Sequence, residues 1–316
     1  MSLSLALVVA GFVLLILGGD RLVLAAARLS CYSGMSPVLV GALVVGMGTS
    51  APEWLVSVLA AARGSLDLSI GNVVGSNVAN LTLVLGASVL VAPITGQGRT
   101  LRREGILMLG AMALLTLLAW NNRLELWEGL LLLGAMGAAI LLLIRWAHRD
   151  ALLRQPVCPG AEEGDQEGQG KTIFVEILVG TLALAATLTG AELLVRGAQN
   201  LAQHLGFSEG FIGLTLVAVG TSLPEMATAL AAAHRGENDI LVGNLMGSNL
   251  FNSLAIMGSA ALMGQIAVQE NFQAVLAAMM GVTLLAGLFA VTGNRLVRTE
   301  GLLLLVAYGG FIGVTL

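Results

Sequence analysis

The chain contains an internal repeat at a constant offset of 172 residues. Residues 41–86 align without a gap on residues 213–258, and 19 of the 46 aligned positions are identical. A match of this length predicts two copies of one structural unit. Any fold proposed for the chain must therefore accommodate the same pattern of elements twice.

The composition is that of a membrane protein. The 316 residues are 57% hydrophobic and only 11% charged, and the mean hydropathy is +0.90. The charged fraction is roughly half that of an average soluble domain, which excludes a soluble enzyme. The net charge of −4 also gives no reason to expect a nucleic-acid partner or a polybasic lipid-binding surface.

Apolar runs of membrane-spanning length predict ten transmembrane helices. These spans are 3–19, 37–62, 68–93, 105–120, 126–146, 172–195, 208–234, 240–263, 273–291 and 299–315. The first and sixth are expected to continue as amphipathic extensions over Ala25–Leu29 and Gly197–Leu205, because no helix breaker interrupts them. We therefore predict an all-α membrane protein.

The distribution of Lys and Arg predicts how the chain is oriented. Twelve of the fifteen basic residues lie in alternate loops, and only Arg63, Arg123 and Arg196 lie in the others. The positive-inside rule then places both termini outside and the Gly- and Glu-rich loop 147–171 in the cytoplasm, as a flexible linker. Because each half holds five spans, the halves 1–146 and 172–316 are predicted to be inverted repeats.

Each repeat contains a Gly-Thr-Ser-x-Pro-Glu segment inside a predicted span. Glu53 and Glu225 are the carboxylates of these segments, and an ionisable residue at this depth indicates a functional site. Pro52 and Pro224 cannot donate a backbone hydrogen bond, so we expect kinks near 46–49 and 218–221 that turn carbonyl oxygens inward. A simple packing kink is the alternative interpretation.

Each repeat also contains a Gly-Asn-x-x-Gly-Ser-Asn-x-x-Asn segment. Its polar residues recur at four-residue steps, which places them on one helix face. They are Asn72, Ser76 and Asn80 in the first copy and Asn244, Ser248 and Asn252 in the second. The serines and the last asparagines are expected to face a site, whereas hydrogen bonding between helices is an equally good interpretation for Asn72, Asn77, Asn244 and Asn249.

Together these segments offer oxygen donors for a hard cation. Carboxylates, amides, hydroxyls and freed carbonyls suit Ca²⁺ or Na⁺, whereas Mg²⁺ demands a tighter octahedron. Two carboxylates balance one divalent ion or two sodium ions, which is a physical basis for exchange. The predicted spans carry no HExxH or convincing serine-hydrolase set, so we expect a transporter without a cofactor or an obligate protein partner.

The paired segments resemble the two α-repeats of the cation/calcium exchanger superfamily, in particular sodium/calcium exchangers of the prokaryotic type. The resemblance extends over all ten predicted spans and implies a sodium/calcium antiporter working by alternating access. It implies that Glu53 and Glu225 are the central Ca²⁺ ligands, helped by the backbone carbonyls of Thr49 and Thr221. It further implies flanking Na⁺ sites at Ser50, Ser222, Ser76, Ser248 and the carbonyls of Gly46 and Ala218, with Asn80 and Asn252 lining the centre.

The sequence departs from the family at the central position, and two other functions stay open. Several relatives have Asp where this chain has Asn80 or Asn252, so potassium dependence and the number of sodium ions stay open. A calcium/proton exchanger and a cation channel are the alternatives. Proton-coupled members usually carry a different signature, which favours Na⁺ over H⁺. A compact chain with a short central loop indicates a prokaryotic plasma-membrane protein.

Other charged and sulfur-containing residues are expected to have local roles. Asp20 and Glu192 are repeat mates at helix ends, where interfacial positions are expected, and Glu192 should pair with Arg196 four residues later. Cys31 and Cys158 fit no CxxC pattern, and we expect free thiols.

Overall fold

The protein is built almost entirely of helices. The computed structural model describes residues 2–95, 98–153, 166–205, 218–263, 266–267, 272–292 and 295–315. Within these ranges six helices are long and apolar enough to cross a membrane, or seven if one bent pair is counted as a span. The chain is therefore a multi-pass membrane protein, and the number of ten spans stays a prediction.

The chain packs as two compact units, and each unit combines segments from both halves of the sequence. The first unit comprises Met1–Thr49 and Leu143–Asn244, and the second comprises Ser50–Leu142 and Leu245–Leu316. The units therefore do not follow the predicted halves 1–146 and 172–316, because a repeat is defined by equivalent sequence and a unit by packing.

The first unit contains the two longest helices and the start of each repeat. Its elements are α1 (Ser2–Ser33), α2 (Pro37–Val40), the π-helical turn η1 (Gly41–Gly46), α3 (Met47–Thr49), α9 (Gln166–His204), α11 (Ala218–Thr221) and α12 (Leu223–Arg235). The end of α8 (Leu126–Leu153) and the start of α13 (Asn238–Leu250) also belong to it. The predicted helical extensions of the first and sixth spans are confirmed.

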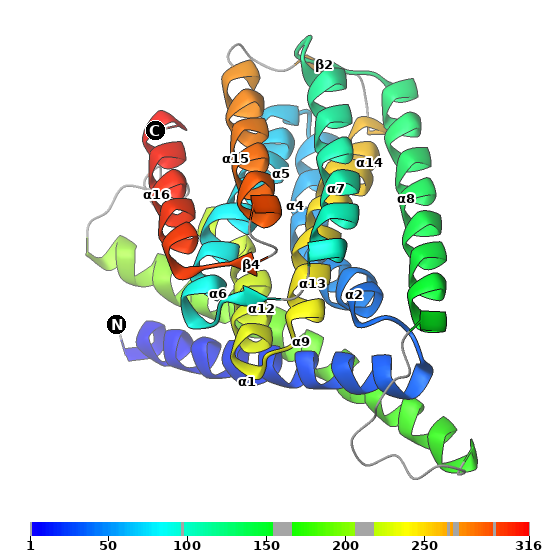
Figure 1. Ribbon diagram of the computed structural model, residues 1–316. Coiled ribbons are helices and arrows are strands. Elements are labelled where there is room, and N and C mark those ends of the chain that lie inside the picture. The colour runs from blue at the N-terminus through cyan, green and yellow to red at the C-terminus, as the bar shows by residue number, and fades with distance from the viewer. Residues whose placement is uncertain are drawn as a thin grey trace. The chain divides into compact units, whose positions relative to one another are not determined.

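Helices α1 and α9 lie side by side and antiparallel (Figure 1). Glycines allow the close approach: a Cβ on Gly11 would lie 2.5 Å from the backbone nitrogen of Leu194, and one on Gly190 would lie 2.5 Å from that of Leu15. These distances are shorter than any real Cβ contact, so only glycine fits at the two positions. Small residues at helix contacts are the usual means of close packing in membranes.

The second unit contains most of the remaining spans. Its elements are α4 (Ala51–Ala62), α5 (Leu66–Ala79), η2 (Asn80–Val84), α6 (Leu85–Val91), β1 (Ile94–Thr95), α7 (Gly98–Ala119), β2 (Arg123–Leu124), η4 (Phe251–Ile256), α14 (Met257–Ala261), β3 (Ile266–Ala267), α15 (Phe272–Thr292), β4 (Arg295–Leu296) and α16 (Arg298–Thr315). Most of α8 and the end of α13 complete this unit.

Two short antiparallel ladders in the second unit follow the 172-residue offset. Strand β1 pairs with β4, with Ile94 opposite Leu296, and β2 pairs with β3, with Leu124 opposite Ile266. Adding 172 to Ile94 gives Ile266, and adding 172 to Leu124 gives Leu296. The two ladders are therefore equivalent residue by residue, with the partners exchanged.

A glycine contact shows the same exchange of partners. A Cβ on Gly86 would lie 2.8 Å from the carbonyl oxygen of Gly301, and a Cβ on Gly258 would lie 3.0 Å from that of Gly129. Gly258 is the repeat equivalent of Gly86, and Gly301 is that of Gly129. Helices α6 and α16, and α14 and α8, thus meet through equivalent residues.

The structure corrects the predictions for the loop 147–171 and for Cys31. Helix α8 continues to Leu153 and α9 begins at Gln166, so both ends of the predicted loop 147–171 are helical. Cys31 is disulfide-bonded, so the prediction of a free thiol is wrong for this residue. Cys158 and residues 154–165 and 206–217 lie outside the described residues.

Candidate functional site

A break in the helix precedes each of the two repeated glutamates. Helix α4 begins after Ser50, whose φ and ψ are −81° and 8°, and α12 begins after Ser222, with −88° and 5°. The segments Pro37–Thr49 and Ala51–Ala62 are bent by 48°. Pro52 and Pro224 lie in the first turn that follows, where the missing backbone N–H costs nothing. A helix break is confirmed in both copies, one residue beyond each predicted range, whereas the inward orientation of the freed carbonyl oxygens stays a prediction.

The glutamates lie in the first turn of the new helices and are buried. Glu53 and Glu225 are each 1% exposed. The positive end of the helix dipole favours a carboxylate in a first turn. The break therefore places each carboxylate in the interior, at the end of a helix whose dipole favours negative charge.

The first unit holds Glu225 through a chain of hydrogen bonds. The Asn244 amide nitrogen donates to Thr228 Oγ1 at 3.0 Å, and the Thr228 hydroxyl is 2.9 Å from the Pro224 carbonyl and 3.0 Å from that of Glu225. Asn244 and Thr228 are at most 1% exposed. Asn244 thus connects α13 to the first turn of α12, where Glu225 lies.

In the second unit Asn72, the repeat equivalent of Asn244, bonds directly to the backbone of Glu53. The Asn72 amide nitrogen donates to the carbonyl oxygen of Glu53 at 3.2 Å and to Ser57 Oγ at 2.9 Å. For Asn72 and Asn244 the alternative of hydrogen bonding between helices is therefore confirmed. The bonded hydroxyls were not among the predicted residues, although Ser57 and Thr228 lie one turn after each Glu, and this spacing could have indicated them.

Asn80 and Asn252 have buried side chains without a hydrogen bond to any described residue. Each is 1% exposed, and within the described part of the chain neither amide atom of either residue has a hydrogen-bond partner. Asn80 begins the π-helical turn η2, and Asn252 lies in η4. Buried amides without partners are costly, and π-helical turns are frequent at functional sites. Both observations suit residues that bind a ligand.

The neighbouring asparagines differ between the repeats. The Asn77 amide nitrogen donates to Ser253 Oγ at 2.9 Å, whereas that of Asn249 donates to the Leu245 carbonyl of its own helix at 2.7 Å. The repeat equivalent of Ser253 is Leu81, which offers no hydroxyl. The alternative of hydrogen bonding between helices is therefore confirmed for Asn77 and wrong for Asn249.

The two units each contain part of the predicted site. The first contains Gly46, Thr49, Ala218, Thr221, Ser222 and Glu225, and the second contains Ser50, Glu53, Ser76, Asn80, Ser248 and Asn252. In the first unit the Thr49 hydroxyl donates to the carbonyl of Gly46 at 3.2 Å, at the point where η1 ends. Thr49, Ser50, Ser76, Ser222 and Ser248 are all buried.

Comparison with known proteins identifies the family. The sequence pattern of the family described as "Sodium/calcium exchanger protein" matches residues 3–145 and 175–316. The putative antiporter CaxA of Alkalimonas amylolytica is 36% identical over 317 residues, which cover 98% of each chain. Sodium/calcium exchanger MaX1 of Methanosarcina acetivorans is 30% identical over 348 residues, covering 99% of this chain and 98% of the relative.

Solved structures agree with the sequence matches. The sodium-calcium exchanger NCX_Mj, in a crystal soaked with 10 mM Na⁺ and zero Ca²⁺, superimposes with a TM-score of 0.86 and 28% sequence identity, and the match covers 98% of each chain. The match to the family extends over both repeats and both glutamate segments. The chain therefore belongs to the sodium/calcium exchanger protein family.

Proposed function

We propose that this protein is an antiporter that exchanges Na⁺ for Ca²⁺ across the membrane by alternating access. The observation that carries the proposal is the duplicated helix break, which places one buried glutamate in the first turn of α4 and one in the first turn of α12. Membership of the exchanger family and the likeness to NCX_Mj support it. The protein is accordingly a transporter and no enzyme.

The architecture that we propose is ten spans in two inverted repeats. The strand ladders support it, because two copies related by a twofold axis exchange partners: β1 pairs with β4, and their equivalents β3 and β2 pair in the same register. An odd number of spans in each copy inverts the second relative to the first. We place the protein in the plasma membrane with both termini outside and the segment 147–171, which includes the ends of α8 and α9, in the cytoplasm.

The ion ligands that we propose are the oxygen donors of the repeated segments. Glu53 and Glu225 bind Ca²⁺ together with the carbonyls of Thr49 and Thr221. The donors for Na⁺ are Ser50, Ser76, Ser222 and Ser248, the carbonyls of Gly46 and Ala218, and the central amides of Asn80 and Asn252. The unpartnered amides of Asn80 and Asn252 support this assignment, because an ion would satisfy their oxygens.

Charge balance makes the two ions alternative occupants. Two glutamates compensate one Ca²⁺ or two Na⁺, and a site that releases one ion must bind the other to avoid leaving two carboxylates buried without a counter-charge. Protons bound to the two carboxylates would also neutralise them, so Ca²⁺/H⁺ exchange is the second candidate. In that case the glutamates release protons as Ca²⁺ binds.

Transport in proteoliposomes tests the proposal. Vesicles loaded with Na⁺ and diluted into Na⁺-free buffer should take up radioactive Ca²⁺, whereas K⁺-loaded vesicles and vesicles with only a pH gradient should not. Glu53→Gln and Glu225→Gln should each abolish uptake. Uptake driven by the pH gradient alone would replace Na⁺ with H⁺ as the counter-ion, and uptake in every arm would indicate a channel.

Glu128→Gln is the matched control, because it also removes a buried carboxylate. Glu128 is 5% exposed and accepts the backbone N–H of Glu125 at 2.7 Å, as a helix cap. A glutamine oxygen can accept the same bond, so this variant should transport normally. Loss of transport in all three variants would refute the assignment of the site to Glu53 and Glu225.

A further inference from the structure

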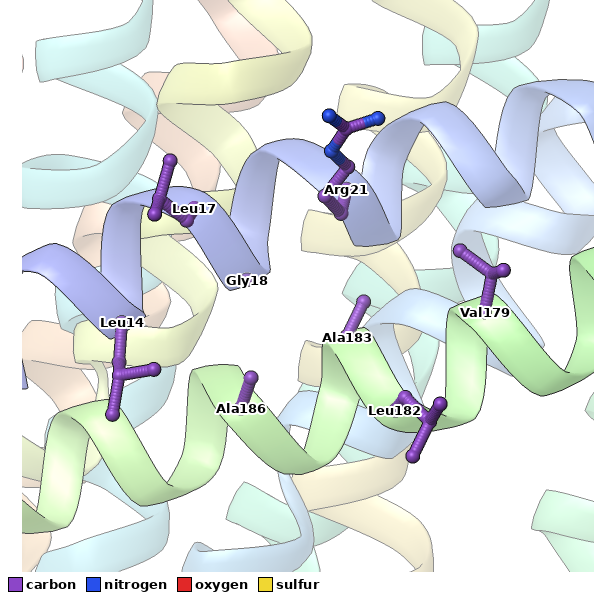
Figure 2. Close-up of a pocket in the computed structure, with 8 residues that line it drawn as sticks. All are labelled: Leu14, Leu17, Gly18, Arg21, Val179, Leu182, Ala183 and Ala186. Atoms are coloured by element: carbon purple, nitrogen blue, oxygen red, sulfur yellow. The ribbon is translucent and has the colours of Figure 1, made fainter.

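A groove runs between α1 and α9 in the first unit. It has a volume of about 300 Å³ and is lined by Leu14, Leu17, Gly18 and Arg21 from α1 and by Val179, Leu182, Ala183 and Ala186 from α9. Figure 2 shows the short side chains of Ala183 and Ala186 on α9, and Gly18, which has no side chain, on the facing part of α1. The lining is apolar except for Arg21.

Arg21 marks the end of the groove that reaches the membrane interface. The residues from Ser2 to Gly19 are uncharged, and they span about 27 Å at 1.5 Å per residue, close to the thickness of the hydrocarbon core. Arg21 therefore lies at the level of lipid headgroups. Leu14 lies two helical turns back from it, about 10 Å toward the bilayer interior. The groove thus leads from a headgroup region into the acyl-chain region.

Arg21 is exposed, and its side chain makes no hydrogen bond or ion pair within the part of the chain that the structure describes. Its neighbour Asp20 attracts it electrostatically but is hydrogen-bonded elsewhere, because both Asp20 oxygens accept hydrogen bonds from Arg235 at 2.7 Å. Arg28, two turns further along α1, is instead 3.2 Å from Glu176.

We propose that this groove binds one acyl chain of an anionic phospholipid, with the lipid phosphate at Arg21. The apolar lining binds the acyl chain, and the exposed guanidinium of Arg21 binds the headgroup phosphate. Every lipid has acyl chains, so the groove alone gives no headgroup preference. The preference comes from Arg21, and it does not depend on the ion that the protein transports.

Native mass spectrometry of the purified full chain tests the proposal. The delipidated protein is titrated in detergent with palmitoyl-oleoyl phosphatidylglycerol, which is anionic, or with the phosphatidylcholine of the same chains, which is zwitterionic. Binding of one lipid molecule should be about fivefold tighter for phosphatidylglycerol than for phosphatidylcholine. One basic residue near a membrane surface contributes about 1 kcal/mol to the binding of anionic lipid, which corresponds to this ratio of dissociation constants. Arg21→Gln should remove the preference.

Two further variants separate the headgroup contact from the groove. Arg28→Gln removes a charge of the same helix that already has a partner, so the preference for phosphatidylglycerol should persist. Ala186→Leu fills the groove and should weaken binding of both lipids at least fivefold. An unchanged preference in Arg21→Gln, an equal loss in Arg28→Gln, or unchanged binding in Ala186→Leu would each overturn the proposal.

Discussion

Replacing Asn244 by Ala should weaken Ca²⁺ binding by loosening the turn that carries Glu225. The substitution removes the 3.0 Å hydrogen bond to Thr228, whose hydroxyl keeps its contacts to the carbonyls of Pro224 and Glu225. One intramolecular hydrogen bond contributes about 0.5–1.5 kcal/mol. If this energy holds Glu225 in place, the apparent KM for Ca²⁺ should rise about 2- to 10-fold.

Asn249→Ala is the control for this prediction. Asn249 lies on the same helix and is 0% exposed, against 1% for Asn244, but within the described residues its amide nitrogen donates only to Leu245 of α13. The same atoms are deleted at the same degree of burial, so general damage to the interior should be equal. Only the connection to α12 differs.

The assay is Ca²⁺ uptake driven by an outward Na⁺ gradient in proteoliposomes, measured over a range of Ca²⁺ concentrations. Asn244→Ala should raise the KM, and Asn249→Ala should change it less than twofold. A double-mutant cycle with Thr228→Val should show that the two losses are not additive, because both remove one connection. An equal rise in KM for Asn249→Ala, or additive losses in the cycle, would refute the positioning role of Asn244.

Three further substitutions test other parts of the structure. Asn80→Asp adds a carboxylate at a proposed ligand and should lower the KM for Ca²⁺ at least about fivefold in the same uptake assay. Gly86→Ala places a Cβ 2.8 Å from a carbonyl oxygen of α16 and should lower the free energy of unfolding by about 1–3 kcal/mol. Thermal unfolding measures this loss, and Gly110→Ala, which has open space around the added Cβ, should not show it. Asp20→Asn weakens the pair with Arg235, whose side chains are 34% and 33% exposed, so the melting temperature should fall less than in Gly86→Ala and the difference should shrink in high salt.

Much of the fold could be predicted because its signals are local or repeated. The helix break at Ser50 follows from Pro52, and the continuation of α1 to Ser33 follows from the lack of a breaker. The pair of Glu192 with Arg196, four residues apart on one helix, was also predicted and is confirmed. In each case the chemistry of neighbouring residues decides the structure, without reference to distant parts of the chain.

The features that could not be predicted depend on residues far apart in sequence. The strands are two residues long, too short for any alternation of apolar and polar residues to appear. Asp20 was expected at an interface, and nothing near it in sequence indicates that its partner is Arg235, 215 residues away. The π-helical turns begin at residues such as Asn80 whose type does not distinguish a π-helix from an α-helix.

The residues of the candidate site could be predicted from the sequence, but their hydrogen-bonding roles could not. The repeat identified both glutamates and the asparagine stripes, and the structure shows that the stripes divide into two groups. Asn72 and Asn244 hold the glutamate helices, whereas Asn80 and Asn252 keep their amides unpartnered within the described chain. Sequence spacing places all four on equivalent faces and cannot separate these roles.

The strand ladders also have a consequence for how the protein is made. Strand β1 begins at Ile94, but its partner β4 does not begin until Arg295. At the usual ribosomal speed of about 5–20 residues per second, β1 emerges roughly 10–40 s before the strand that pairs with it. During synthesis the backbone N–H and C=O groups of β1 therefore lack their strand partner until β4 has been made. A ribosome pausing inside the second half would lengthen the period in which the nascent chain is open to quality-control proteases.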